Sequence, residues 1–129
     1  MPMVDDIADY LATQNQGTVG TTIFTHHLPP TPDVAMMVAQ FPMGPTVRTM
    51  TSRVAELVGL QMQFRALTRS DAEAAAYAAF VLLDGIRNRT IGGSLYLGIS
   101  GKRSPQQLRI DQNPIRYIWY CEFGVIKTL

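Results

Sequence analysis

Apolar residues recur at helical spacing near the start of the chain. Val4, Ile7, Ala8 and Leu11 lie three or four positions apart within residues 3–14, which is the pattern of an amphipathic helix. Several aspartates lie close to the expected first turn, where the helix dipole favours negative charge. We therefore expect an N-terminal helix with one buried face.

A strict alternation of apolar and polar residues marks the clearest strand, at residues 60–67. A period of two predicts a strand with one buried face and one solvated face. Shorter apolar stretches at residues 21–24 and 34–41 predict two earlier strands. Prolines between these two stretches break regular pairing.

The segment Ser70-Asp71-Ala72-Glu73 matches a capping box, in which the serine caps the helix start and the glutamate reaches back. The alanine-rich sequence behind it predicts the main helix of the domain, ending at about Arg87. Small side chains let such a helix approach a sheet closely. Gly92-Gly93 then marks a turn.

Strand patterns dominate the rest of the chain. We expect strands at residues 94–100, 106–110 and 115–127, with residues 101–104 as a polar, basic loop. The first of these strands is expected to place Leu95, Leu97 and Ile99 on one face. The strand at residues 115–127 is expected to have five alternating residues on one face: Tyr117, Trp119, Cys121, Phe123 and Val125.

The order of these elements predicts the fold class. We expect a single α+β domain over residues 1–129, in which a small antiparallel or mixed β-sheet packs against the main alanine-rich helix and the N-terminal helix. The length of 129 residues and the 47% hydrophobic content are those of one folded domain with a real core. No apolar run approaches the roughly 18 residues of a membrane span. The acidic N-terminus lacks the features of a signal peptide, so we expect synthesis in a cytosol.

Charge is unevenly spread along the chain, although the net charge is only +1. Residues 1–47 hold four acidic and no basic residues, whereas residues 85–129 hold seven basic and two acidic residues. The basic third could meet nucleic acid, or the acidic third of a neighbouring copy, or both could be solvated faces. A possible basic stripe comprises Arg48, Arg53, Arg65 and Arg69. No interleaved exposed aromatic residues accompany it, so we assign no nucleic-acid site.

Catalytic and metal-binding patterns are weak. The sequence Gly98-Ile99-Ser100 begins a nucleophile elbow, but Lys102 stands where the second glycine is needed. His26 and His27 are adjacent, and neighbouring side chains of an extended segment point to opposite faces, so we expect a surface turn. Cys121 lies in an apolar row and is expected to be buried. We therefore expect no catalytic residue, metal site or cofactor.

Four stretches from Gly59 onward carry a resemblance to a known protein family. They are residues 59–66, which end in an Arg-Ala pair; the helix that ends with residues 83–86; residues 91–97; and Ser104-Pro105 with Leu108, Asp111 and the aromatic strand that ends near Phe123-Gly124-Val125. On these stretches the chain resembles the minor capsid or tail terminator proteins of long-tailed bacteriophages. The N-terminal helix, followed by a strand and a proline-bearing loop, also resembles the family.

The resemblance implies a structural role without catalysis or a cofactor. Such subunits assemble as a ring, typically six-fold, on the head-proximal end of the tail tube. The ring stops tube growth and offers a surface to the head–tail connector protein. DNA passes through the lumen without sequence-specific binding. The implied partners are further copies, the tail tube protein and the connector, with no membrane, and the implied location is the virion tail or neck after assembly in the host cytoplasm.

Interface candidates come from polar segments expected to be loops. They are Gly44, Thr46, Arg48, Arg53, Gly101, Lys102, Arg103 and Ser104.

Three alternative functions stay open at the level of sequence. A head–tail connector or neck protein of the same particle differs from a terminator in whether it binds the tube. A nucleic-acid-binding module would show salt-dependent binding to DNA. A small enzyme of another class would need an acid/base pair that folding brings together.

Overall fold

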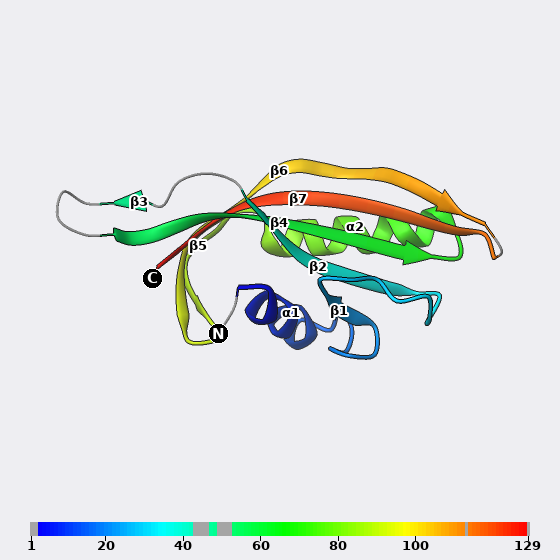
Figure 1. Ribbon diagram of the computed structural model, residues 1–129, viewed down its shortest axis with the longest axis horizontal. Coiled ribbons are helices and arrows are strands. Elements are labelled where there is room, and N and C mark those ends of the chain that lie inside the picture. Colours follow the sequence, from blue (N-terminus) through cyan, green and yellow to red (C-terminus); the bar gives the residue numbers. More distant parts are fainter. Residues whose placement is uncertain (1–2, 43–46, 49–52, 113, 129) are drawn as a thin grey trace.

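The computed structural model describes residues 3–42, 47–48, 53–112 and 114–128. These residues form two helices and seven strands, which follow one another as α1 (Met3–Thr13), β1 (Ile23–Thr25), β2 (Ala35–Pro42), β3 (Val47–Arg48), β4 (Arg53–Ala66), α2 (Arg69–Leu83), β5 (Ile86–Ile91), β6 (Ser94–Asp111) and β7 (Arg116–Thr128) (Figure 1). Neither helix in this part of the chain is long and apolar enough to cross a membrane.

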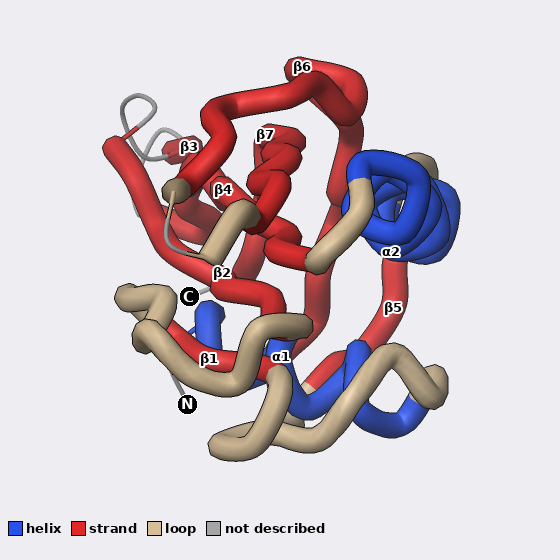
Figure 2. The backbone as a smooth tube through the Cα atoms, turned by 90° about the vertical axis from the view of Figure 1, so that its right-hand side faces the viewer, coloured by secondary structure: helices blue, strands red, loops and turns tan. Residues whose placement is uncertain are grey.

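One sheet contains all seven strands. Its order is β1-β2-β4-β7-β6-β5, and β3 pairs with β4 beside this path. The β1–β2 pair is parallel, whereas the other pairs are antiparallel. The sheet curls into a half-barrel (Figure 2). Helix α1 contacts β1, β2 and β5, so it lies between the two ends of the curl, and α2 packs on β4, β6 and β7.

The expected α+β class is wrong, because the protein is mostly β. Strands hold more than half of the described residues and helices less than a quarter. The main cause is β6, which continues through residues 101–104, where a loop was expected. A ladder uses backbone groups, so polar side chains do not end it. The register shifts between Gly101 and Arg103, and between Arg103 and Gln106, are bulges that let the pairing with β7 continue.

The boundaries of α2 also differ from the prediction. Thr68, not Ser70, is the N-cap, and its hydroxyl accepts a hydrogen bond from the Asp71 amide at 3.2 Å. The helix ends at Leu83, because the next residue is extended and Gly85 has a φ of +89°. The predicted last turn therefore belongs to β5, a strand that the sequence pattern missed.

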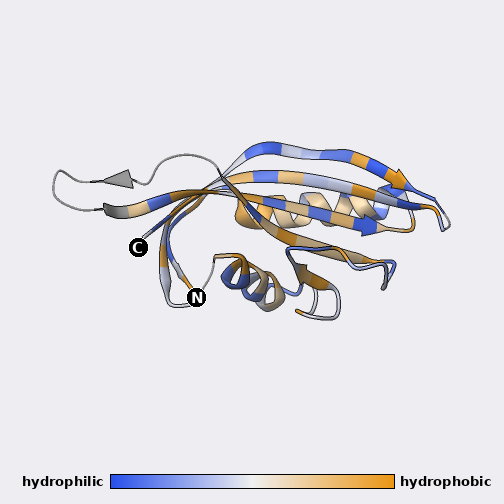
Figure 3. Ribbon diagram, in the orientation of Figure 1, coloured by the Kyte–Doolittle hydropathy of each residue, from blue (hydrophilic) through white to orange (hydrophobic). Residues whose placement is uncertain are grey.

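The inner face of the sheet, defined as the face that the two helices cover, holds the core (Figure 3). The predicted alternation in β4 is confirmed, since its even-numbered apolar residues from Leu60 to Ala66 are buried. Cys121, Phe123 and Val125 of β7 are also buried as predicted. The helices add a further set of buried residues: Val4, Ile7, Leu11, Ala76, Ala79 and Leu83.

The predicted face of the strand at residues 94–100 is wrong. Leu95 and Leu97 are exposed at 37% and 36%, whereas Tyr96 and Ile99 are fully buried. The cause is a register shift between Tyr96 and Gly98, which places two residues three positions apart on the same face. The hydroxyl of Tyr96 therefore lies in the core and needs a partner there.

Polar contacts fasten α1 to the β5–β6 hairpin. The Tyr96 hydroxyl donates to Oδ2 of the buried Asp6 at 2.8 Å, and Arg89 donates to the Tyr10 hydroxyl at 2.7 Å. Burial, followed by the hydrogen bond to Asp6, raises the pKa of Tyr96. Gly92 at the hairpin turn has a φ of +60°, and a Cβ there would lie 2.1 Å from Oδ1 of Asp6. The turn therefore requires glycine.

Candidate assembly surfaces

The outer face of the sheet, defined as the face turned away from the helices, is polar at its centre. Gln61 of β4 donates to Glu122 Oε2 at 3.3 Å, and Arg103 of β6 pairs with Glu122 Oε1 at 2.9 Å. The hydrogen bond to Glu122 raises the pKa of the Arg103 guanidinium. Arg103, one of the predicted interface residues, is therefore held by a partner in its own chain.

The remaining predicted residues of this segment lie in β6 and not in a loop. The Gly101 amide donates to Asp84 Oδ1 at 2.8 Å, and a Cβ at Gly101 would lie 2.4 Å from the Phe80 ring. Lys102 and Ser104 are exposed. Lys102 makes no hydrogen bond or ion pair with any residue that the structure describes. Lys102 is therefore the predicted residue of this segment best placed to meet a partner.

The other four predicted interface residues belong to a separate region. Gly44 and Thr46 lie outside the described residues. Arg48 of β3 and Arg53 of β4 are paired in register, within an arm that projects beyond the body of the sheet (Figure 1). In the sheet, β7 separates β4 from β6. Arg48 and Arg53 are therefore neighbours on β3 and β4, whereas Lys102 lies on β6.

A depression of about 210 Å³ hollows the outer face near the base of this arm. Its apolar walls are formed by Leu57, Leu97 and Ile126, from three different strands. Leu57 and Ile126 are cross-strand partners, and Gly98 pairs with Ile126 on the other side. Gly98 and Gly124 line the floor, which stays open because glycine has no side chain. Hereafter this site is the outer-face depression.

Two cations border the outer-face depression. Arg87 of β5 and Lys102 of β6 both line it, together with the hydroxyl-bearing Ser100. Arg87 donates from one nitrogen to the Ile86 carbonyl at 3.2 Å, and its guanidinium makes no other hydrogen bond with the described residues. Apolar walls with basic side chains at the edge suit a partner that offers apolar side chains and acidic neighbours.

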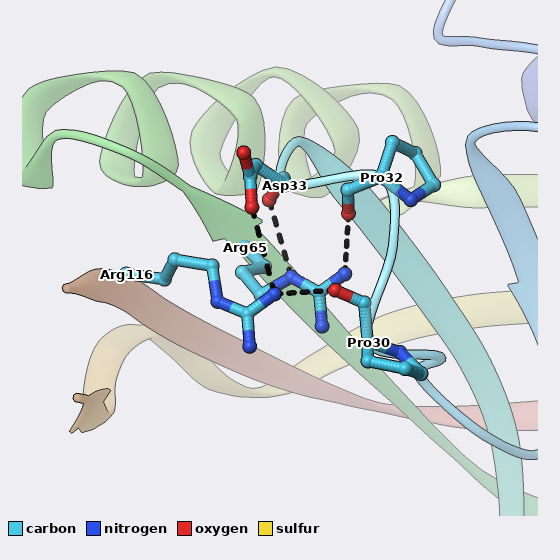
Figure 4. Close-up of polar contacts among 5 residues, drawn as sticks. All are labelled: Pro30, Pro32, Asp33, Arg65 and Arg116. Carbon is cyan, nitrogen blue, oxygen red and sulfur yellow. Dashed lines mark hydrogen bonds and ion pairs between the residues drawn. The ribbon is translucent and has the colours of Figure 1, made fainter. Parts of the chain in front are cut away.

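A second cluster clamps the proline-bearing loop onto the sheet (Figure 4). Arg65 of β4 is only 4% exposed, and it donates to the carbonyl oxygens of Pro32 and, at 3.1 Å, Asp33. Arg116 of β7 donates to the Pro30 carbonyl and lies 3.6 Å from the Asp33 carboxylate. Burial, followed by the nearby charge of Arg116, lowers the pKa of Arg65. Arg65 is therefore structural and belongs to no exposed basic stripe.

The uneven charge of the two ends of the chain is partly neutralised within one molecule. Asp33 pairs with Arg116, and Asp6 is buried against Tyr96. Among the four acidic residues of the first third, these contacts leave Asp5 and Asp9 at the surface of α1. A contact between the acidic third of one copy and the basic third of another is therefore not needed to explain the charge pattern.

Reactive groups are few in the described part of the chain. It contains no group of three or more His, Cys, Asp or Glu side chains that could hold a metal ion. His26 and His27 are exposed in the turn after β1, as predicted, and His26 has a φ of +71°. Burial raises the pKa of the Cys121 thiol to about 12, with a smaller effect from Glu122. A buried thiol of this kind is a poor nucleophile.

Comparisons with known proteins concern the fold. No protein-family model and no curated protein matches the chain. A chain from the virion of a native gene transfer agent particle matches with a TM-score of 0.56 at 18% identity, over 84% of this chain and 80% of that one. A second solved structure matches with a TM-score of 0.55 at 12% identity, over 99% of this chain and 97% of that one. At these identities, the likeness establishes a shared fold.

Proposed function

We propose that this protein is a non-enzymatic structural subunit of a phage-like particle, and specifically its tail terminator. The observation that carries the proposal is the shared fold with a chain of a gene transfer agent virion, over 84% of this chain and 80% of that one. The sequence resemblance to tail terminator proteins points to the same class of particle. Residues 1–129 would act as a single domain.

The surfaces of the fold support an assembly role. The two helices cover the inner face of the sheet, so its outer face, with the outer-face depression, remains available to partners. Strand β5 ends the sheet and pairs with β6 alone among the described strands, so it presents an edge to which a partner can add. A subunit with unlike faces can repeat head to tail, and such contacts close into a ring when the rotation allows.

In the proposed mechanism, copies form a ring, six-fold by the family resemblance, on the head-proximal end of the tail tube. The ring covers the surface on which the next tube subunit would add, so growth stops. Its opposite side meets the head–tail connector protein, and DNA passes through the lumen without base-specific contacts. The protein would thus be part of the virion tail or neck.

Tube growth in the presence of the protein tests this function. Purified tube protein is polymerised with and without this protein, tube length is measured, and the mass of the protein alone is measured by light scattering. A terminator shortens tubes at substoichiometric ratios. Unchanged tube lengths together with binding to the isolated connector would instead identify a connector or neck protein.

A further inference from the structure

The surface of α2 that is turned away from the sheet carries an apolar stripe. Ala74, Tyr77, Ala78 and Val81 are exposed and follow the i, i+3, i+4, i+7 spacing of one helix face. Tyr77 is 46% exposed and Val81 is 73% exposed. The opposite side of α2 packs on the core, so the helix is apolar on two sides. This pattern is typical of a helix that is covered on both sides. We refer to the four exposed residues as the α2 stripe.

Acidic side chains border the α2 stripe. Asp71 and Glu73 lie near the start of the helix, and Asp84 follows its last residue. Asp71 is three positions before Ala74 and Glu73 is four positions before Tyr77, which makes each pair neighbours along the helix surface. Asp84 lies beyond the helix and accepts from the Gly101 amide, so its carboxylate faces the sheet and not the stripe. Arg69 is the only basic residue between positions 69 and 84. The border of the stripe therefore has a net negative charge.

We propose that the α2 stripe of one copy docks into the outer-face depression of the next copy. This inference rests on the proposed ring-forming function and specifies the contact that builds the ring. The two surfaces are complementary in hydrophobicity and in charge. The depression offers apolar walls with Arg87 and Lys102 at its edge, and the stripe offers apolar side chains with Asp71 and Glu73 beside them. Val81, which is more exposed than Tyr77, is the side chain that enters.

The two surfaces lie on opposite sides of the same stretch of sheet. Gly101 faces the helix, since a Cβ there would meet the ring of Phe80. Its sequence neighbours Ser100 and Lys102 line the outer-face depression instead, as the alternation of a strand requires. The two surfaces therefore face in opposite directions, and one copy cannot bring its own stripe to its own depression.

Opposed surfaces produce a head-to-tail contact, which is the type that generates rings. An isologous contact between two α2 stripes would leave Asp71 and Glu73 without a basic partner, whereas the depression supplies Arg87 and Lys102. The charge pattern therefore favours docking of the α2 stripe into the outer-face depression over docking onto a second α2 stripe.

Cysteine cross-linking distinguishes the two geometries. Val81→Cys and Ser100→Cys are made separately, each variant is concentrated under conditions in which rings form, and the disulfide is formed with copper-phenanthroline as the oxidant. The native Cys121 is buried and contributes little background. We expect cross-linked dimers when the two variants are mixed and not when either is alone.

Exchanging the charges of Lys102 and Glu73 tests whether these two residues meet at the edge of the contact. Lys102→Glu and Glu73→Lys should each weaken assembly about tenfold or more, within the range of close interfacial charge pairs, and the double variant K102E/E73K should recover most of it. Arg109→Glu on the same strand has the same change in charge, lies outside the depression and should assemble normally. Val81→Asp should weaken assembly by about 30-fold or more, as for the loss of an interface hot spot.

The results separate this inference from the proposed function. Rings that form normally with V81D, or that cross-link V81C with V81C, would overturn the docking contact and leave the ring function standing. A mixture of V81C and S100C that gives no dimer in a sample containing rings would do the same. A protein that stays monomeric and leaves tube growth unchanged would overturn the function and the contact together.

Discussion

Removing the Tyr96 hydroxyl should destabilise the protein, because it removes the hydrogen-bond partner of a buried carboxyl group. Asp6 and Tyr96 are both fully buried, and the hydroxyl is the partner of Asp6 Oδ2 at 2.8 Å, while Oδ1 has no partner among the described groups. Tyr96→Phe therefore leaves a buried carboxyl group without a hydrogen bond. Such a group costs about 1–3 kcal/mol, and more when it is charged.

The assay is chemical denaturation of the wild-type protein and Y96F at pH 7, followed by circular dichroism. We expect a loss of about 2–3 kcal/mol in the free energy of unfolding. The double variant Asp6→Leu/Tyr96→Phe removes both polar groups and should be more stable than the sum of the single changes predicts. A Y96F variant within about 0.5 kcal/mol of the wild type would show that the hydrogen bond does not hold α1 to the hairpin.

The same contact predicts a pH dependence. The pKa of Tyr96 is raised in the folded state. The stability that protonated Tyr96 contributes is therefore fully present at pH values below the unfolded pKa of about 10. As the pH rises above that value, the unfolded state loses the proton first, and stability should fall by about 1.4 kcal/mol per pH unit. Y96F should lack this component of the slope. Equal slopes for Y96F and the wild type between about pH 10 and 11 would contradict the assignment.

Three further predictions concern other contacts. Arg65→Ala should lower the free energy of unfolding by about 2–3 kcal/mol, because two carbonyl oxygens of the clamped loop lose a charged donor, whereas the exposed Arg69→Ala should stay within about 0.5 kcal/mol; equal effects in denaturation curves would refute the clamp. Gly101→Val should cost about 1–3 kcal/mol by overpacking against Phe80, and a wild-type midpoint would show that the helix can move aside. Cys121 should react with Ellman's reagent only on unfolding, because burial raises its pKa to about 12; rapid labelling of the native protein would contradict its burial.

Local periodicity predicted the elements whose side chains carry a regular pattern. The alternation in β4 and the helical spacing in α1 are confirmed because one face of each element packs against the core. The pattern failed in β6, where bulges reset the alternation and backbone pairing continues through Lys102 and Arg103. It also failed at Ile86, where an apolar residue in phase with the helix begins a strand.

The candidate surfaces differ in how far the sequence could reveal them. The outer-face depression joins Leu57, Leu97 and Ile126, which are brought together only by pairing between distant strands. No local pattern predicts such a site. The sequence pattern could have revealed the α2 stripe, because Tyr77 and Val81 repeat at helical spacing opposite the buried alanines. An alanine-rich helix hides this signal, since small apolar residues occur on all of its sides.

Electron microscopy of tail tubes incubated with this protein is the direct test of the terminator role. We expect a closed ring at one end of each tube, always the head-proximal end, and no density along the tube walls. Tubes whose ends stay bare, or that carry the protein along their length, would contradict a terminator role.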